Sequence, residues 1–264
     1  MKNILSESEK QNPFRAEEFR DFLANKELLS KFKSTYSENY SSIEDLNSSV
    51  FWNKIFLTSG PKEIESSIVK DRIQNIIKIV SKKSGKLLDV GLGYGFLEKE
   101  LLKAKLKNIL LHGIDVSDVA IQEAKKNFTG KFIKGSILKI PFENSFFDII
   151  LCLEVLEHIS PYLTFVALQE LFRVLKKNGI LIITIPINEG LEVMYKKGIN
   201  PSSHVRIYTE KIIKSELKIA GFTILKEKYF YAFRNCYFLK KILKETIFRN
   251  RWKPNNLLIV ARKK

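Results

Sequence analysis

Two hydrophobic patterns alternate through most of the chain. Short apolar runs within 87–95 and 109–117 are typical of buried strands. After the first of them, Leu97, Leu101 and Ala104 recur at a spacing of three to four, which predicts an amphipathic helix. Strands that alternate with helices indicate an α/β protein, in which helices cover both faces of a parallel sheet.

Several residues mark the ends of these elements. Ser117 and Thr209 have side chains that accept hydrogen bonds from the first amides of a helix, so each predicts a helix start. Gly221 predicts the end of the helix that begins after Thr209. Further strands are predicted at 180–185, 222–231 and 256–262.

The first 60 residues lack this alternation. Apolar residues at helical spacing predict a helix over 14–36, and the residues of 37–49, rich in serine and asparagine, predict a loop. A long amphipathic helix then runs up to Gly85. We therefore expect a helical N-terminal extension over 1–60, which caps a domain formed by 61–264.

The connection between the last two predicted strands is long. In this insert, 232–254, the apolar residues Phe238, Leu239 and Ile242 alternate with basic residues, which predicts a basic amphipathic helix. Three interpretations stay open: a lid packed on the domain, a surface that contacts a membrane or a lipid-like substrate, and an interface with a partner.

The turn after the first predicted strand is the most informative stretch. Asp89 ends the strand, and Gly91, Gly93 and Gly95 follow at a spacing of two. Glycine lets the backbone take positive φ and approach a ligand closely, and a helix N-terminus favours anionic groups. The spacing differs from the G-x-G-x-x-G of dinucleotide sites, and the Gly-Lys-Ser/Thr ending of a phosphate-binding loop is missing from the sequence.

Two later stretches add to this turn. Asp115 ends the second strand, where a carboxylate can accept both hydroxyls of a ribose. Dinucleotide enzymes have an acid at a similar offset, so Asp115 alone does not discriminate. The stretch 135–158 adds Gly-Ser-Ile at its start and Glu-Val-Leu-Glu-His at its end.

Together these four motifs resemble the class I S-adenosylmethionine-dependent methyltransferases, in particular the small-molecule group that includes ubiquinone-type O-methyltransferases. The resemblance covers about residues 61–230. It implies a doubly wound, Rossmann-like fold with a seven-stranded, mostly parallel sheet whose last two strands form an antiparallel pair. It also implies S-adenosylmethionine as the cofactor.

The resemblance further implies roles for single residues. Asp89 would organise the glycine loop near the methionine ammonium, the loop would pass under the methionine and ribose, and Asp115 would accept the ribose hydroxyls. Many relatives have Gly-Asp where this chain has Gly135-Ser136, so adenine recognition would rest on Ser136, on the amide of Ile137 and on apolar stacking. The implied cofactor-binding residues are Asp89, Gly91, Gly93, Gly95, Asp115, Val116, Ser136, Ile137 and Leu153.

The Glu-Val-Leu-Glu-His stretch lies where the resemblance places the reacting methyl group. A hydroxyl nucleophile needs a proton acceptor or a metal that lowers its pKa. His158 is the candidate general base because an imidazole titrates near neutrality, and Glu154 is the second candidate catalytic residue. The same stretch can instead serve only to bind the cofactor and shape the loop.

A divalent metal is a sharper hypothesis for the same stretch. The spacing of Glu154, Glu157 and His158 resembles the metal-binding E-x-x-E-H of some RNA 2′-O-methyltransferases and quinone O-methyltransferases. His204, from a later loop, could supply a further ligand. Mixed oxygen and imidazole ligands suit magnesium, manganese or zinc.

We expect methyl transfer to oxygen of a small or lipid-like acceptor. The N-terminal helices, the loop 187–208 and the insert would build its pocket, with Tyr195, His204, Arg206 and Tyr208 as candidate pocket residues. An RNA methyltransferase and a non-catalytic cofactor-binding scaffold stay open as alternatives. A nicotinamide dehydrogenase is the weakest of the readings.

The amino-acid composition says less about function than the motifs do. The chain has two cysteines, no apolar run that suits a signal peptide and none near the ~20 residues of a membrane span, so a cytoplasmic protein is expected. The net charge of +16 suits a nucleic acid or an anionic membrane as partner. The lysines are scattered over the predicted helices, however, which favours a general compositional bias.

Overall fold

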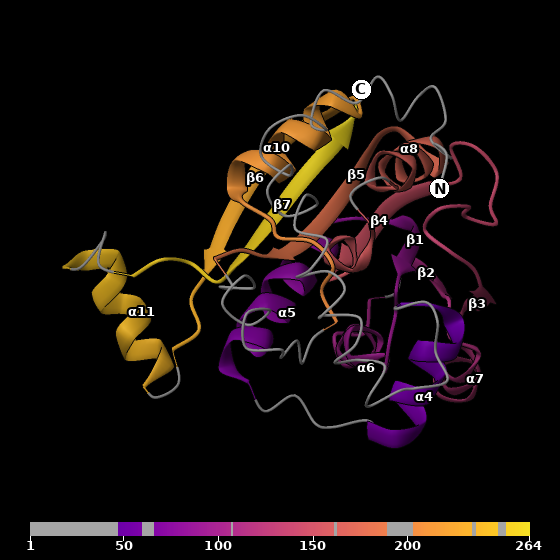
Figure 1. The fold of residues 1–264 in the computed structure, drawn as a ribbon, viewed down its shortest axis with the longest axis horizontal. Coiled ribbons are helices and arrows are strands. Elements are labelled where there is room, and N and C mark those ends of the chain that lie inside the picture. Colours follow the sequence, from indigo (N-terminus) through magenta and orange to yellow (C-terminus); the bar gives the residue numbers. More distant parts are fainter. Residues whose placement is uncertain are drawn as a thin grey trace, which may run out of the picture.

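A seven-stranded sheet forms the centre of the computed structural model (Figure 1). Its strands lie in the order β3-β2-β1-β4-β5-β7-β6, and all neighbours are parallel except that β7 is antiparallel to β5 and β6. This confirms the predicted mostly parallel, doubly wound sheet. The strands are β1 (Gly85–Val90), β2 (Ile109–Asp115), β3 (Lys131–Lys134), β4 (Phe147–Leu153), β5 (Leu175–Pro186), β6 (Phe222–Phe230) and β7 (Asn256–Lys263).

The structure describes seven stretches of the chain. They are 47–59, 66–106, 108–160, 163–188, 203–233, 236–247 and 252–264. The helix predicted over 14–36, most of the loop predicted over 37–49, and Tyr195 lie outside them.

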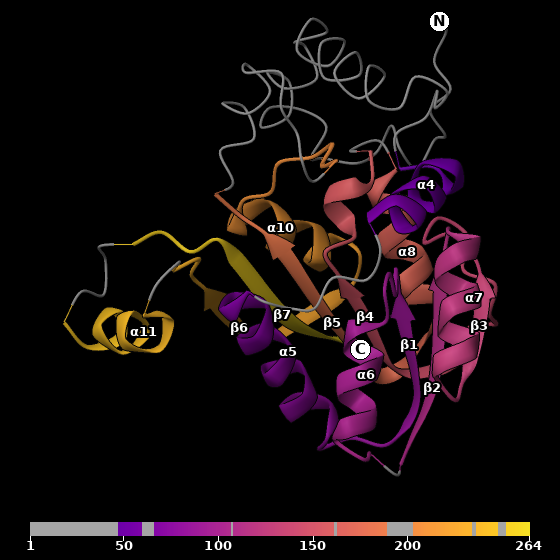
Figure 2. The same cartoon turned by 90° about the horizontal axis from the view of Figure 1, so that it is seen from below.

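Helices cover both faces of the sheet (Figure 2). They are α4 (Ser49–Ser59), α5 (Ser67–Val80), α6 (Phe96–Lys103), α7 (Asp118–Asn127), the short 3₁₀ helix η2 (Leu156–His158), α8 (Thr164–Val174), α10 (Glu210–Ile219) and α11 (Tyr237–Thr246). Among the described residues, no helix is both long and apolar enough to cross a membrane.

Two hydrophobic clusters, one on each face, hold these layers together. Successive residues of a strand point to opposite faces, so Leu87 packs with α5 and α6, whereas Leu88 packs with α8 and α10. Both leucines are fully buried. The near-continuous apolar runs of β1 and β4 follow from this, because strands covered on both faces have no solvent side.

Three predicted helix boundaries agree with the structure, whereas the helix predicted up to Gly85 ends at Val80 and Gly85 begins β1. The Ser117 hydroxyl accepts a hydrogen bond from the Ala120 amide, and the Thr209 hydroxyl accepts one from the Ile212 amide. Gly221 follows α10 with a φ of +94°. The prediction for β5 was too short, since this strand extends over Leu175–Pro186 and its register against β4 shifts near Phe147.

The helix α4 was missed. The prediction of a loop over 37–49 gave no sign of a helix directly after it. The apolar residues of α4 are spread around the helix, since Phe51 is buried whereas Val50 and Leu57 are exposed. The helical spacing of its apolar residues is therefore weak. In the structure Phe51 is fully buried, and α4 packs beside α7.

The basic amphipathic helix predicted within 232–254 is α11. Figures 1 and 2 both show it beside the domain, beyond the edge strand β6. The helix contacts α5 through Tyr237 and Lys241, and the three interpretations of the insert stay predictions.

A buried ion pair joins α8, α10 and the segment before α10. Arg206 and Tyr208 are only 2% and 1% exposed. The Arg206 guanidinium pairs with Glu216, donates to the Thr164 hydroxyl and lies 4.5 Å from the centre of the Tyr208 ring. The expectation that Arg206 and Tyr208 line an acceptor pocket is therefore wrong, because both belong to the core.

Loss of one partner of this pair should destabilise the fold. We expect Glu216→Ala to lower the free energy of unfolding by about 3–5 kcal/mol, because it leaves the Arg206 charge buried and uncompensated. Urea titration measures this. The control is Glu123→Ala, which removes the exposed partner of Lys126 and should cost less than about 1 kcal/mol. Equal, small effects of the two variants would contradict the buried pair's structural role.

Candidate functional site

The candidate site lies where β1, β2 and β4 end. In a parallel sheet the carboxyl ends of the strands share one edge, and ligands of doubly wound proteins bind in the crevice outside it. This edge brings together Asp89, Asp115 and the segment from Leu153 to His158.

Glycine is required at two positions of the loop between β1 and α6. Gly91 has a φ of +76°, and a Cβ there would lie 2.6 Å from Val155 Cγ2. Gly95 has a φ of +70°, and a Cβ there would lie 2.4 Å from the Phe128 ring. These glycines therefore let the loop pack against its own domain, whereas the sequence analysis explained Gly91 by close approach of a ligand.

The Asp115 carboxylate fixes the middle of this loop. Its Oδ2 accepts a hydrogen bond from the Gly93 amide at 3.0 Å, and its Oδ1 accepts one from the Ser117 amide at 2.8 Å. Burial raises the pKa of Asp115, although these amides oppose the shift. Each carboxylate oxygen has a second lone pair, so the group can accept further hydrogen bonds from a ligand. Among the described residues, a Cβ on Gly93 would have only Phe56 Cζ within 4.0 Å, so this part of the chain leaves space for a ligand beside it.

Asp89 forms a buried carboxyl pair with Glu98, a residue that the sequence analysis missed. Asp89 is 3% exposed and Glu98, on α6, is fully buried. Burial raises the pKa of Asp89 to about 6, and burial together with the nearby Asp89 raises the pKa of Glu98 well above its usual range. Burial thus favours the protonated form of Glu98, which can donate a hydrogen bond to the Asp89 carboxylate and stabilise its ionised form. An acid three residues before the buried Leu101 was the signal available in the sequence.

The predicted adenine segment forms a tight turn after β3. The Ser136 hydroxyl accepts a hydrogen bond from the Leu138 amide at 3.1 Å, so this side chain holds its own turn. The Ile137 side chain is buried in the core. Val116 and Leu153 are half-buried where β2 and β4 end. All of the predicted cofactor residues are therefore at one edge of the sheet.

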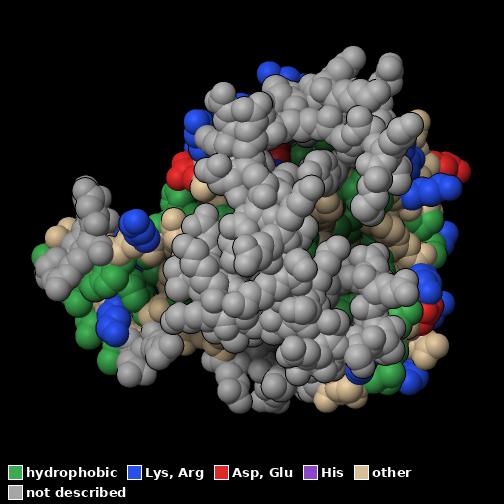
Figure 3. Space-filling view, viewed as in Figure 1, with side chains coloured by type: hydrophobic (Ala, Val, Ile, Leu, Met, Phe, Trp, Pro, Cys, Tyr) green, Lys and Arg blue, Asp and Glu red, His purple; other side chains and the backbone are tan. Residues whose placement is uncertain are grey.

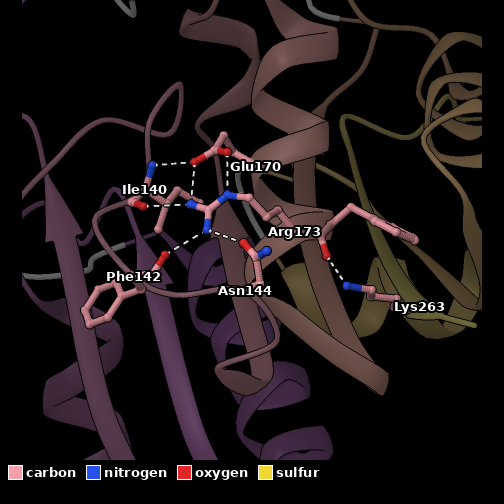
Figure 4. A network of polar contacts seen from close by, with 7 residues as sticks. Ile140, Phe142, Asn144, Glu170, Arg173 and Lys263 are labelled. Atoms are coloured by element: carbon pink, nitrogen blue, oxygen red, sulfur yellow. Dashed lines mark hydrogen bonds and ion pairs between the residues drawn. The ribbon is translucent and has the colours of Figure 1, made fainter.

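Arg173 of α8 binds the backbone that follows this turn (Figure 4). Its guanidinium donates to the carbonyls of Ile140 and Phe142 at 2.9 and 2.8 Å, and to Asn144 at 2.9 Å. It also pairs with Glu170, whose carboxylate accepts a hydrogen bond from the Ile140 amide at 2.8 Å. This network fixes the position of the loop that follows Ser136.

Glu154 has a structural role in this site. Its φ of +56° is left-handed, and its carboxylate accepts two hydrogen bonds from the Asn256 side chain at 2.8 and 3.0 Å. It also forms an ion pair with Arg72 at 3.0 Å. Glu154 thus links the end of β4 to α5 and β7, and its carboxylate does not join the histidine cluster described next.

Glu157, His158 and His204 form the cluster that the sequence led us to expect, without Glu154. The ligand atoms of these three residues all lie within 4.8 Å of one another. The Glu157 carbonyl accepts hydrogen bonds from the amides of Val205 and Arg206 at 2.9 and 3.2 Å, which hold the segment with His204 against η2. His204 Nε2 lies 3.9 Å from Glu157 Oε1.

The environment of His158 makes this residue a poor general base. Its Nδ1 lies 3.3 Å from the Ser203 carbonyl, which accepts a hydrogen bond when Nδ1 is protonated. Burial and the neighbouring His204 lower the pKa of His158 to about 3. An imidazole with this pKa is neutral at pH 7 and has little driving force to take a proton from a hydroxyl.

The donor set of the cluster suits a divalent metal. One carboxylate and two neutral imidazoles are typical ligands of zinc, and similar sets bind other transition metals. Metal–ligand bonds of ~2.1 Å would need the donor atoms to approach to about 3.0–3.5 Å of one another. This requires small side-chain movements from the spacing in the structure.

Aromatic side chains of α4, a helix that was not predicted, cover the site. The Trp52 ring meets His158 edge to face at 5.1 Å between centroids, and Phe56 meets Tyr94 at 4.6 Å. Asn53 accepts a hydrogen bond from the Ser117 hydroxyl at 2.7 Å. Helix α4 therefore forms one wall of the site.

Comparison with known proteins agrees with this geometry. Residues 88–183 match the sequence family of the methyltransferase domain. An uncharacterized protein of Methanocaldococcus jannaschii is 31% identical over 171 residues, which cover 63% of this chain and 65% of that protein. The demethylmenaquinone methyltransferase of Lactococcus lactis is 33% identical over 124 residues, which cover 45% of this chain and 41% of that enzyme. The chain thus spans about two fifths to two thirds of the length of these relatives.

A solved structure shares the fold. The N-methyltransferase NodS from Bradyrhizobium japonicum, in complex with S-adenosyl-L-homocysteine, has a TM-score of 0.60 and 15% sequence identity. The similarity covers 82% of this chain and 98% of that one. The matched domain, the shared fold and the ordered motifs agree with one another: residues 88–183 match a methyltransferase domain, and the chain is similar to the class I S-adenosylmethionine-dependent methyltransferases.

Proposed function

We propose that this protein transfers the methyl group of S-adenosylmethionine to an oxygen of a small, lipid-like acceptor. The observation that carries the proposal is the meeting of two buried acids, Asp89 and Asp115, at neighbouring strand ends with the glycine loop between them. The Glu157–His158–His204 cluster lies at the end of the next strand, where an acceptor would approach.

In this proposal each of the two acids binds a different part of the cofactor. The Asp89 carboxylate would attract the methionine ammonium, and Asp115 would accept the ribose hydroxyls with the lone pairs that its two amides leave free. The turn at Ser136 and Ile137 would lie against the adenine, and the Arg173 network would keep that turn in place.

The methyl-transfer step mainly requires that the protein position the acceptor and the methyl group. The sulfonium activates the methyl group, so the protein must hold the acceptor oxygen in line with it. Trp52 and Phe56 of α4 would form the wall that excludes water from the reacting groups. A metal held by Glu157, His158 and His204 would lower the pKa of a bound hydroxyl.

Similarity to a quinone-directed enzyme supports the acceptor class. The demethylmenaquinone methyltransferases of Lactococcus lactis and Staphylococcus aureus are 33% and 30% identical to parts of this chain. Their names give demethylmenaquinone as the compound that they methylate. We infer an acceptor of the same general kind for this protein.

A labelled-methyl transfer screen tests the function. The full chain is incubated with labelled cofactor and, in parallel, with cell lipids, small metabolites and RNA. We expect label in the lipid or metabolite fraction, at an oxygen. Label in RNA alone would replace this proposal with an RNA methyltransferase. Cofactor binding with no labelled product in any fraction would favour a non-catalytic role.

The pH dependence of cofactor binding should report the Asp89–Glu98 pair. Asp89 has its pKa raised to about 6, so the carboxylate that attracts the ammonium is present above that pH and is lost below it. We expect the affinity for S-adenosylhomocysteine to fall about tenfold from pH 7 to pH 5, measured by calorimetry.

Variants of Glu98 sharpen this test. Glu98→Leu removes the hydrogen bond that stabilises the ionised Asp89, so the fall in affinity should begin at higher pH. Glu98→Gln keeps a hydrogen-bond donor and should leave the profile near that of the wild type. A flat wild-type profile between pH 5 and 8 would show that Asp89 does not contact the ammonium. Identical profiles for all three proteins would show that Glu98 does not stabilise the Asp89 carboxylate.

The metal cluster can be tested with a matched histidine control. We expect His204→Gln to weaken binding of zinc or manganese at least tenfold by calorimetry, because the site loses one of three ligands. The control is His112→Gln, since His112 of β2 is the third histidine of the chain and lies outside the cluster. Full methyl-transfer activity in a strong chelator, with equal metal affinity of both variants, would exclude the site.

A further inference from the structure

Helix α11 has its hydrophobic side turned to the solvent. Phe238, Leu239 and Ile242 are 66%, 58% and 59% exposed, and Ile247 directly after the helix is 68% exposed. In Figure 3 the projection formed by α11 carries hydrophobic side chains, drawn in green, beside Lys or Arg side chains in blue. In an ordinary surface helix the apolar face is buried, so this arrangement is the reverse of what packing alone would produce.

The opposite side of α11 faces the domain through polar contacts. The Tyr237 hydroxyl and the Lys241 ammonium both donate to Asp71 Oδ2 of α5, at 2.9 and 2.7 Å. The Lys244 ammonium lies 4.4 Å from the centre of the Tyr231 ring. These contacts fix the rotation of the helix, so its apolar side is held outward.

A basic, aromatic pocket lies between α11 and the end of β6. It has a volume of about 230 Å³ and is lined by the lysines 228, 241 and 244 together with four aromatic residues. A site that combines aromatic rings with ammonium groups suits the interface of a lipid bilayer, where apolar and anionic groups meet.

We propose that α11 docks this protein on the surface of an anionic lipid membrane. Phe238, Leu239 and Ile242 would enter the boundary between headgroups and acyl chains, and Lys240 would attract anionic headgroups. A basic helix with a strongly apolar side binds membranes in this way. The rest of the charge distribution agrees, since the chain has a net charge of +16.

A second protein surface fits this face less well. Four apolar side chains of this kind offer roughly 300–500 Å² of surface. A stable interface takes about 800 Å² from each partner. Nucleic acid is disfavoured because its backbone contacts require polar and basic groups where α11 presents Phe, Leu and Ile.

The position of α11 relates docking to the proposed reaction. Asn256 at the start of β7 pairs with Phe230 at the end of β6 and with Pro186 at the end of β5. The insert therefore leaves the sheet at the same edge that carries the candidate site, and the Asn256 side chain also binds Glu154. Resting on the proposed function, docking would bring a lipid-like acceptor to this edge.

Vesicle co-sedimentation of the full chain tests the docking. Vesicles of phosphatidylcholine alone are compared with vesicles that contain phosphatidylglycerol as well. We expect at least tenfold stronger binding to the anionic vesicles, weakened by salt. The triple variant Phe238→Ser/Leu239→Ser/Ile242→Ser should reduce this binding at least tenfold, and Lys240→Gln should reduce the preference for anionic vesicles.

Two controls keep the outcomes apart. Leu102→Ser/Leu110→Ser removes apolar side chains that are 50% and 61% exposed elsewhere on the domain, and it should leave vesicle binding unchanged. Binding of S-adenosylhomocysteine by the triple variant checks that the cofactor site is intact, so failure to dock is distinguishable from failure of the proposed function. Unchanged vesicle binding by the triple variant would overturn the inference. So would a wild-type dimer in light scattering that the triple variant loses, which would assign the face to a second copy.

Discussion

The site depends on the two backbone amides that donate to the Asp115 carboxylate. These hydrogen bonds, from Gly93 and Ser117, tie the glycine loop of β1 to the start of the helix after β2. The Ser117 hydroxyl extends the tie to Asn53, so α4 is held over the same edge. A single buried carboxylate thus positions the loop, the second strand end and the N-terminal wall, and the remaining features of the site are arranged around it.

Local patterns in the sequence predicted the elements on which this arrangement rests. Strand periodicity located the ends of β1 and β2, and hence the acids Asp89 and Asp115. The side chains of Ser117 and Thr209 predicted helix starts, because a cap acts within three residues of its own position. His204 was expected near Glu157 only through the family resemblance, and the structure places them together.

Contacts between distant parts of the chain set the features that the sequence did not predict. Glu98 pairs with Asp89 only because α6 folds back on β1, and Arg206 is buried because α8 and α10 supply its partners. Helix α4 lacks a single apolar stripe. Its contacts with α7 and with the rings of Tyr94 and His158 could not be predicted from the spacing of its own residues. The outward apolar face of α11 depends on Asp71, which lies 166 residues away from Tyr237 along the chain.

Calorimetry with S-adenosylhomocysteine tests the central claim most directly. The wild type should bind one equivalent, and Asp115→Asn should lose at least tenfold in affinity, because its amide nitrogen would oppose an N–H donor where the carboxylate accepted one. Asp118→Asn, an exposed acid three residues further on, should bind as the wild type does. Equal affinities of all three proteins would contradict the account, because the glycine loop and Asp115 would then not form the cofactor site.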